Sequence, residues 1–473
     1  MDADETPSKA SVLTLAIIFL ASLIDGLDAS IVTVSLPTMA IDLDVSVSQS
    51  SWVMFSYVVG MAAFLLPMGK MAKNNRVRKF MITGTVIFGL SSFMCGVSKE
   101  IDNFWILIAF RTIQGLSAAM MSSVLPSMVV HMLPEDRKGL GMSVMGASTA
   151  LALILGPVVG GAISSFLDWS WLFYINVPIC VVIVILSMIH IPDDGRPDRE
   201  KDPTFVGGLS AMMVIGSLLV IMEDLGDPDI NLRGRIICAV LAALGVYLLV
   251  WSIRRDAKRA IVSPKMLNNR EYIVVGIAFL LCTIVVAGCQ FLLPYMLQDY
   301  WDLSTFDSGL YLSAVSVAMM LVVIPVGRMC DRFGCKWPAA MAAILRAAFC
   351  MIMIVLATHH SEPLMLIPAL LVFGASHAFS GTAQPTRMIH HATPGYEDEA
   401  TNFMLVVNYV ASALGCVIFA MLFSVFSKTA NMNGLSHNEL LDGFLPAMWF
   451  SVAILMIALM CTLSVKNKIV RKK

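Results

Sequence analysis

Long apolar stretches, separated by short polar segments, run along the chain from residue 11 to residue 464. A helix needs about 20 residues to cross the hydrocarbon core of a bilayer, which is about 30 Å thick. Helices are expected instead of strands because every backbone amide in lipid must be bonded within its own segment, whereas a barrel would show short alternating segments. The candidate spans, about fourteen in number, lie near residues 11–36, 50–68, 80–97, 104–131, 140–165, 172–190, 205–222, 235–252, 272–297, 309–327, 338–357, 363–387, 400–426 and 444–464.

The composition is that of a membrane protein. Hydrophobic residues make up 58% of the chain and charged residues 14%, with a mean hydropathy of +0.80, whereas soluble domains hold about 45–50% apolar and about 25% charged residues. The ten Cys residues are scattered without a C-x-x-C pair, so neither a metal site nor a disulfide framework is predicted. The expected partners are the lipid bilayer and a small amphipathic molecule, and no nucleic-acid partner is expected.

The basic residues are strongly segregated. Of the 32 Lys and Arg residues, 26 fall in segments on the side of the N-terminus and four on the opposite side, while Arg111 and Arg346 lie inside spans. Because cytoplasmic loops carry an excess of Lys and Arg, we predict a plasma-membrane protein with both termini in the cytoplasm and an even number of spans. Residues 1–10 are acid-rich and are interpreted as a cytoplasmic N-terminus instead of a cleaved signal peptide.

Two loops repeat one pattern. PMGKMAKNNRVRKF follows the second span and PVGRMCDRFGCKWP follows the tenth, and in each a helix is predicted to end at a Gly, Gly69 or Gly327, before a short basic turn. The copies are too far apart for six spans, and two additional spans fill the difference. The predicted organisation is an N-terminus (1–10), an N-terminal six-helix bundle (11–190), linkers with a two-helix central insertion (191–271, spans near 205–222 and 235–252), a C-terminal six-helix bundle (272–465) and a basic cytoplasmic tail (466–473).

Two carboxylates interrupt the first span, in FLASLIDGLDASIVTVSLP at residues 19–37. Each would cost roughly 2.5–3.5 kcal/mol at the centre of a membrane helix, so Asp25 and Asp28 need a function or a partner. They are three residues apart and therefore face one side of the helix. In a dry cavity such a carboxyl holds a proton, and it releases the proton to water or to an approaching cation. Both are candidate proton carriers, and the alternative is a structural carboxylate held by neighbouring donors.

Polar residues in other spans are candidates for coupling or for substrate binding. Arg111 in the fourth span needs an acidic partner, which a first-span carboxylate can supply either as part of the coupling or as a fixed ion pair. Arg346 is expected either to line a cavity or to form a buried pair, and His377 either to contact substrate or to pack. The substrate-binding candidates are Gln114, Gln290, Arg346, His377 and Asn408.

A stripe of small residues marks the fifth span, which contains LILGPVVGG at residues 153–161. Gly156 and Gly160 stack one turn apart with Gly161 beside them, which lets another helix approach closely, and Pro157 permits a kink. By itself such a stripe indicates close helix packing.

Several segments together resemble the major facilitator superfamily, and in particular its fourteen-span drug/proton antiporter family. They are LDASIVTVSLP (27–37), FRTIQGLSAA (110–119), LILGPVVGG (153–161), WSWLFYINVP (169–178) and the loop DRFGCK (331–336). The resemblance implies an all-α membrane protein with the major facilitator fold, two six-helix bundles and two additional central helices. It also implies that Asp28, at the family's aspartate position, is the main protonation site. The stripe with Gly156 and Pro157 matches the antiporter motif, which uptake symporters generally lack.

The loop motif is implied to latch one conformation of the transporter. Asp331, Arg332 and Gly334 match it in the second copy, but in the first copy Lys73 stands where the family has Asp and Arg76 where it has Gly. The latch of the first half is therefore expected to be altered.

The predicted function is a proton-coupled antiporter, not an enzyme, that exports an amphipathic small molecule by alternating access and binds it near the midplane between the halves. Protons are the expected coupling ion, no other cofactor is expected, and a monomer is predicted. Because the thirteenth span lacks a carboxylate, we expect a neutral, anionic or zwitterionic substrate instead of a dication. The first alternative is a proton-coupled importer of a specific metabolite, and a membrane-embedded enzyme or sensor is less favoured because no metal-ligand or nucleophile set and no soluble output domain is found.

Overall fold

The computed structural model describes residues 9–72, 76–134, 137–194, 269–359, 361–393, 397–427 and 436–467, with scattered positions between 210 and 251. These residues form helices and no strand, and they include 12 helices that are long and apolar enough to cross a membrane. Each of the 12 coincides with a predicted span, which confirms the all-α membrane fold. The predicted central spans near 205–222 and 235–252 lie almost wholly outside the described residues, as do Lys73 and the basic tail from residue 468.

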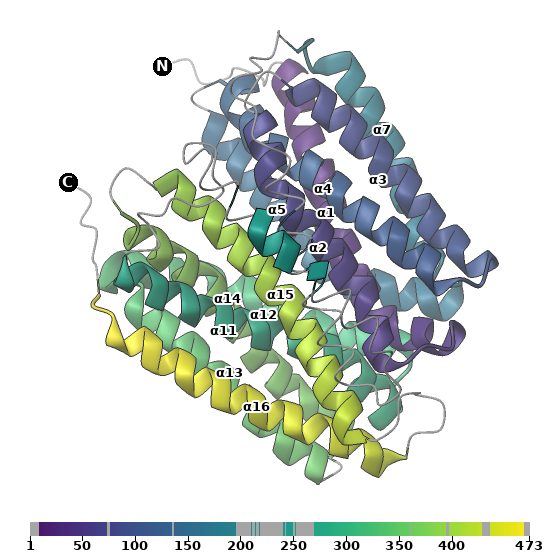
Figure 1. Ribbon diagram of the computed structural model, residues 1–473, viewed down its shortest axis with the longest axis vertical. Helices are drawn as coiled ribbons and strands as arrows, with labels where there is room; N and C mark the ends of the chain where they lie inside the picture. The colour runs from purple at the N-terminus through teal and green to yellow at the C-terminus, as the bar shows by residue number, and fades with distance from the viewer. Residues whose placement is uncertain are drawn as a thin grey trace.

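The first bundle is formed by the helices up to residue 190, drawn purple to blue in Figure 1. Its elements are α1 (Lys9–Asp42), α2 (Val47–Ala72), α3 (Val77–Glu100), α4 (Phe104–Met132), α5 (Lys138–Phe166), and α6 (Trp171–Tyr174) with α7 (Asn176–His190), which together make the sixth span. Helix α1 packs along α5, and α4 packs between α2 and α3. The bundle therefore brings α1, α2 and α4 together around its polar residues.

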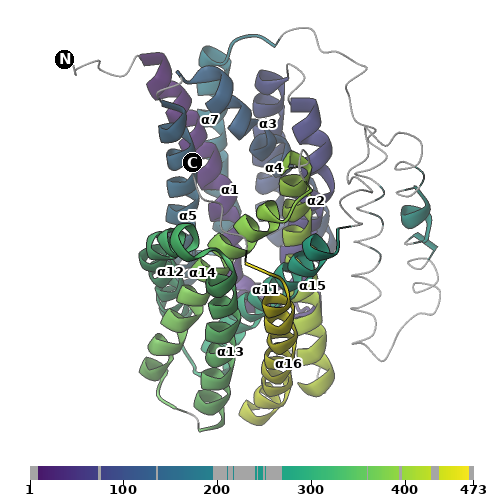
Figure 2. The same ribbon diagram turned by 90° about the vertical axis from the view of Figure 1, so that its left-hand side faces the viewer.

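The second bundle is formed by the helices from residue 270 onward, drawn teal to yellow. Its elements are α11 (Arg270–Tyr295) with the π-helical turn Met296–Tyr300, α12 (Thr305–Phe333), α13 (Lys336–Thr358), the 3-10 turn Pro363–Met365, α14 (Leu366–His390), α15 (Glu397–Ser427) and α16 (His437–Ser464). The two bundles meet chiefly where α5 packs on α12 and α2 packs on α15, and Figures 1 and 2 show them as separate halves.

Side-chain caps and a glycine fix the ends of several helices. Asn103 accepts a hydrogen bond from the Ile106 amide at the start of α4, and Ser304 accepts one from the Asp307 amide at the start of α12, both at 3.1 Å. These caps satisfy backbone donors that a helix start leaves free. Helix α12 ends at Gly334, whose φ of +79° lies in the left-handed region that favours glycine.

The predicted helix ends at Gly69 and Gly327 are wrong. Helix α2 continues past Gly69 to Ala72, and α12 continues past Gly327 to Phe333. An isolated Gly lowers helix stability by only about 1 kcal/mol relative to Ala, which the packing of a long apolar helix outweighs. Asp331 and Arg332 lie exposed on the last turn of α12, so in the second copy Gly334 is the residue at the turn.

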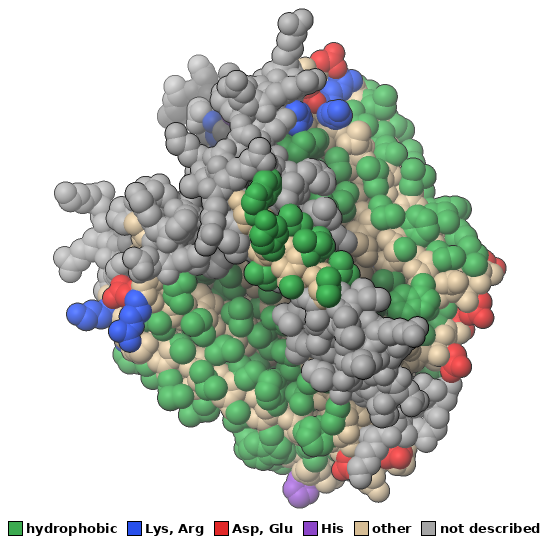
Figure 3. All heavy atoms as spheres, viewed as in Figure 1, with side chains coloured by type: hydrophobic (Ala, Val, Ile, Leu, Met, Phe, Trp, Pro, Cys, Tyr) green, Lys and Arg blue, Asp and Glu red, His purple; other side chains and the backbone are tan. Residues whose placement is uncertain are grey.

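The flank of the molecule is apolar. Figure 3 shows hydrophobic side chains spread over this face, with Lys, Arg and acidic residues at its upper and left margins and acidic residues also along its right and lower margins. Large apolar side chains on the outward faces of several helices are exposed, among them Leu90, Leu321 and Ile324. This is the pattern of a protein whose sides contact lipid and whose charged ends contact water.

Candidate functional site

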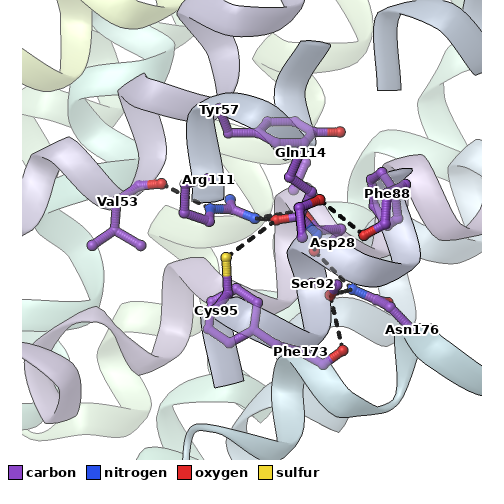
Figure 4. A network of polar contacts seen from close by, with 12 residues as sticks. Asp28, Val53, Tyr57, Phe88, Ser92, Cys95, Arg111, Gln114, Phe173 and Asn176 are labelled. Carbon is purple, nitrogen blue, oxygen red and sulfur yellow. Dashed lines mark hydrogen bonds and ion pairs between the residues drawn. The ribbon is translucent and has the colours of Figure 1, made fainter. Parts of the chain in front are cut away.

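Asp28 of α1 lies at the centre of a buried polar network inside the first bundle (Figure 4). Its Oδ2 accepts a hydrogen bond from Nη1 of Arg111 at 2.6 Å. Its Oδ1 accepts bonds from Nε2 of Gln114 at 2.9 Å and from Nδ2 of Asn176 at 2.8 Å. All four side chains are at most 1% exposed. Asp28 and Arg111 therefore form a buried ion pair, completed by two amides from α4 and α7.

The guanidinium of Arg111 is fixed from several sides. Its Nε donates to the Val53 carbonyl of α2 at 3.1 Å, and Nη1 also donates to Oε1 of Gln114 at 2.8 Å. The rings of Tyr57 and Phe173 lie 4.7 and 5.5 Å from its central carbon, within the range of cation–π attraction. The predicted pairing of Arg111 with a first-span carboxylate is thus present in the structure, with Asp28 as the partner.

Asp25 has different partners, although it is only one turn away on α1. Its Oδ1 accepts a hydrogen bond from the Tyr57 hydroxyl at 2.7 Å, and its Oδ2 accepts one from the Ser122 hydroxyl at 2.9 Å. Asp25 is partly exposed, whereas Asp28 is fully buried. Both carboxylates bond to α4, but Asp25 also bonds to α2 and Asp28 to α7, and of the two only Asp28 is paired with a described cation.

Three residues of this site, Asn176, Tyr57 and Ser122, were not predicted as partners of the two carboxylates. Asn176 was the easiest of the three to predict from the sequence, because it is a polar residue inside WSWLFYINVP at the start of an apolar run. Tyr57 and Ser122 lie in spans whose faces differ little in hydrophobicity. The sequence therefore does not indicate which side chains of these spans point toward α1.

A cavity of about 240 Å³ lies between the two bundles, next to this network. Tyr57 and Arg111 line it from the first bundle, and Gln290 and Asn408 line it from the second. Arg111 is the one charged side chain among the described residues that line the cavity. The lining also contains Ala29, Ser30, Thr33, Val34, Met54, Val58, Leu153, Pro157, Ala287, Leu293, Leu312, Val315, Ser316, Phe373, Tyr409, Ser412 and Cys416.

The predicted substrate-binding residues divide into two groups. Gln290 and Asn408 line the cavity, whereas Gln114, Arg346 and His377 are not among its lining residues. Gln114 is held between Arg111 and Asp28. Arg346 does not line the cavity because it lies on α13, which packs against α12, α14 and α16 and is separated from the first bundle by other helices.

The alternative prediction for Arg346, a pair with a buried acid, does not hold among the described residues either. Arg346 is 0% exposed, and it donates to the backbone carbonyls of Cys282 at 3.0 Å and Ser376 at 3.3 Å. His377 is partly exposed on α14. Arg346 therefore belongs to the interior of the second bundle, and neither residue is among those that line the cavity.

The small-residue stripe of α5 lies where α5 contacts both α1 and the other bundle. A methyl group added at Gly156 would overlap the Ser30 hydroxyl of α1, and one added at Gly160 would overlap the Ile31 carbonyl. A methyl group at Gly161 would meet the backbone of Thr305 at the start of α12. The stripe, with Pro157 in the cavity wall, therefore permits close packing of three helices across the bundle boundary.

The bundles are joined at one end of the molecule, where α1 and α11 both finish. Nε2 of Gln298 donates to the Val34 carbonyl at 2.7 Å, and the hydroxyls of Ser50 and Tyr295 lie 2.5 Å apart. These contacts tie the π-helical turn and the end of α11 to α1 and α2. This end of the cavity is therefore closed by side chains of both halves.

Comparison with known proteins identifies the family. A family model described as Major Facilitator Superfamily matches residues 18–420. The chain belongs to this superfamily. Riboflavin transporter RibZ of Clostridioides difficile (strain 630) is 25% identical over 437 residues, which cover 91% of this chain and 92% of RibZ. Multidrug export protein EmrB of Escherichia coli (strain K12) is 28% identical over 340 residues, which cover 71% of this chain and 65% of EmrB.

A solved structure of the superfamily supports the fold. The crystal structure of a bacterial homolog to the human lysosomal transporter Spinster, in an inward-facing and occupied conformation, matches with a TM-score of 0.70. It is 13% identical, and the match covers 98% of this chain and 97% of that one. At this identity the likeness shows the fold alone, and it confirms the predicted major facilitator fold.

Proposed function

We propose that the protein is a proton-coupled antiporter that exports amphipathic small molecules by alternating access. The observation that carries this proposal is the position of two first-span carboxylates and Arg111 directly beside a cavity that both bundles line. Because the proton site lies next to the substrate cavity, protonation can affect substrate binding, and substrate binding can affect protonation. The similarity to a multidrug export protein supports export as the direction.

The small-residue stripe of α5 also favours antiport. Its glycines let α1, α5 and α12 pack without gaps across the boundary of the bundles. Tight packing here keeps protons from leaking past the carboxylates while the cavity changes sides. A leak would dissipate the gradient that an antiporter uses.

The cavity lining indicates the class of substrate. It offers hydroxyls and amides from residues such as Thr33, Gln290 and Asn408, one guanidinium, and no carboxylate among the described lining residues. Burying an unpaired charge is costly, so a dication without acidic partners is disfavoured. We therefore propose a neutral, anionic or zwitterionic amphipathic substrate.

We further propose a plasma-membrane location with both termini in the cytoplasm, a monomeric unit, and protons as the coupling ion without another cofactor. The segregation of Lys and Arg supports this orientation. With it, the closed end formed by Gln298 and Val34 faces the outside. Substrate from the cytoplasm would then reach the cavity from the opposite end. Enzymatic activity is not part of the proposal.

An importer of one specific metabolite is the second candidate. It is favoured by the match to a protein named riboflavin transporter, which covers 92% of that protein, whereas the matched part of EmrB is 65% of EmrB. This candidate keeps the same cavity and carboxylates but couples substrate and proton in the same direction.

Transport in proteoliposomes separates the two candidates. The purified full chain is reconstituted, a pH gradient is imposed, and movement of a panel is followed: riboflavin as a neutral probe, a fatty acid as an anion, ethidium as a monocation and a bis-quaternary dye as a dication. Movement of a panel compound against proton flow, with no transport of the dication, is expected. Movement with the protons would favour the importer.

A further inference from the structure

We propose that Asp25, and not Asp28, is the carboxyl that binds and releases the transported proton, while Asp28 is the fixed partner of Arg111. This inference rests on the proposed proton coupling and names the residue that performs it. It departs from the expectation, drawn from family resemblance, that the carboxylate at the position of Asp28 is the main protonation site. The observation behind it is the different chemistry of the partners that surround the two carboxylates.

Asp28 is surrounded by N–H donors. A guanidinium has no acceptor, and Arg111 remains charged under all relevant conditions, so its contact with Oδ2 requires a carboxylate. The Gln114 amide is oriented by the bond that its Oε1 accepts from Arg111, which directs its N–H group at Oδ1. A proton added to Asp28 would meet donors on both oxygens and would leave the buried Arg111 charge without a counter-ion. The three N–H donors around Asp28 therefore match a carboxylate that acts as a hydrogen-bond acceptor only.

Asp25 is surrounded by hydroxyls. A hydroxyl can donate one hydrogen bond and accept others, so Tyr57 and Ser122 can serve either form of the carboxyl. The ionised Asp25 accepts two bonds, as in this structure. The protonated Asp25 can donate its new O–H to one of the hydroxyls, which rotates to accept it. A proton can thus be added or removed without breaking the contact set.

The charge balance of the bundle points to the same residue. Asp28 and Arg111 cancel each other, so the first-span network carries one net negative charge when Asp25 is ionised and none when it is protonated. An unpaired carboxylate is costly in a closed, dry site and stable when water reaches it. Closing the cavity therefore favours the step in which a proton from water forms an O–H bond with Asp25, and opening it favours the return of that proton to water.

Among the described residues, the titratable and charged groups around Asp25 leave its charge unbalanced. Tyr57 comes from α2, Arg111 from α4, Tyr409 from α15, and Asp28 lies on α1 itself. Helix α5 faces this turn of α1 with Thr149 and Ala152 next to Gly26, which do not titrate. Helix α7 contributes His190, which contacts Thr14 three turns away along α1, Cys180, which lies near Asp28, and Asn176, which bonds to Asp28 and does not titrate. Helices α11 and α12 reach α1 farther along, at Val34 and Thr38. Arg111, the one cation in this set, is already bonded to Asp28.

Tyr57 connects this carboxyl with the substrate cavity. Its ring lines the cavity and lies against Arg111, while its hydroxyl donates to Asp25. Tyr409 lines the same cavity from the second bundle and packs against the apolar cluster that contains Tyr57. A substrate in the cavity, or a movement of the second bundle, therefore displaces a direct partner of Asp25. This gives the physical link between substrate and proton.

Infrared difference spectroscopy tests the assignment without any substrate. The reconstituted full chain is titrated with acid, and the carbonyl stretch of protonated carboxyl groups is recorded for the wild type, Asp25→Asn and Asp28→Asn. Because the exposed carboxylates titrate as well, the spectra of the wild type and each variant are subtracted; we expect a titrating carboxyl component in the difference for Asp25→Asn and none in the difference for Asp28→Asn. No such component for Asp25→Asn, or one for Asp28→Asn, would overturn the assignment.

Tyr57→Phe keeps the test decisive even where Asp28→Asn fails to fold. This substitution removes the hydroxyl that bonds Asp25 and leaves an aromatic ring against Arg111. The expected result is a shift of the band frequency with the band retained, because the carboxyl loses one hydrogen bond. An unshifted band would assign it to another carboxyl.

A transport measurement separates this inference from the exporter proposal. With riboflavin as probe, Asp25→Asn should lose pH-driven accumulation but keep exchange of internal for external riboflavin. If the wild type moves no compound of the panel and the band still follows Asp25, the assignment stands and the exporter proposal fails. If accumulation by the wild type persists in Asp25→Asn, the assignment fails and the exporter proposal stands.

Discussion

Arg111 connects three parts of the first bundle, since it bonds to α1, α2 and its own helix and packs between two aromatic rings. Such a residue is needed in two ways. Its charge balances Asp28, and its planar group fits contacts that an ammonium group cannot reproduce. Substitution of Arg111 is therefore expected to affect the site strongly.

Arg111→Ala is expected to destabilise the protein strongly. Removing one member of a buried ion pair leaves the other charge unpaired and costs about 3–5 kcal/mol. Thermal unfolding of the purified protein in detergent measures the effect. Arg332→Ala is the matched control, because Arg332 is exposed on α12 and exposed substitutions usually stay within about 0.5 kcal/mol. Equal stability losses in the two variants would contradict the structural role of the pair.

Sequence predicted the polar centre of the site but not its full shell. Asp28 and Arg111 could be recognised because a charge within a membrane span needs a partner. Tyr57 and Ser122 could not, because they reach Asp25 only through the rotation of α2 and α4, which uniformly apolar spans do not reveal. Arg346 looked equivalent to Arg111 as an isolated charge, yet it is held by backbone carbonyls in a helix away from the cavity.

At the scale of elements, α5 determines how closely the helices at the bundle boundary can approach. Its glycines face α1 and α12, whereas Gly146 on the same helix is exposed and has no neighbour within 4 Å. Sequence located the helices well because each apolar run has the length of a bilayer. It misplaced two helix ends, since Gly69 and Gly327 were taken as stops, although a single glycine is tolerated inside a packed helix.

The contrast between two glycines of α5 gives a controlled test. Gly156→Ala places a methyl group on the Ser30 hydroxyl and forces α1 and α5 apart, which typically costs about 1–3 kcal/mol. Gly146→Ala adds the same methyl group into open space and is expected to be neutral or stabilising by up to about 1 kcal/mol. Thermal unfolding measures stability, and acid-induced fluorescence change of a pH dye inside the liposomes measures proton leak. Greater leak is expected for Gly156→Ala alone.

At the scale of the whole molecule, alternating access requires the closed end to open. Its polar contacts join α1 and α2 to α11, the π-helical turn and α12 through side chains such as Gln298 and Ser50, and they lie beside apolar contacts such as that of Phe166 with Phe306. Hydrogen bonds of this kind each contribute about 0.5–1.5 kcal/mol net, so a small set of them can be broken during a transport cycle. Sequence could not predict them, because which ends of two bundles touch depends on the conformation.

Cross-linking tests whether this end must open. The hydroxyls of Thr38 and Thr305 lie 3.5 Å apart across the bundle boundary, so Thr38→Cys with Thr305→Cys should form a disulfide under mild oxidation. Locked in this state, the protein is expected to lose transport of the panel compounds and to recover it after reduction. The described native cysteines are buried except for Cys461, which is intermediate, so they compete little for the oxidant.

The single variants provide the control for this experiment, because each carries one new thiol and cannot bridge the bundles. Oxidation should leave their transport unchanged. If the oxidised double variant is cross-linked and still transports at the rate of the single variants, the end formed by α1 and α12 does not open during the cycle. Substrate would then have to enter and leave by another route, and alternating access about this cavity would be wrong.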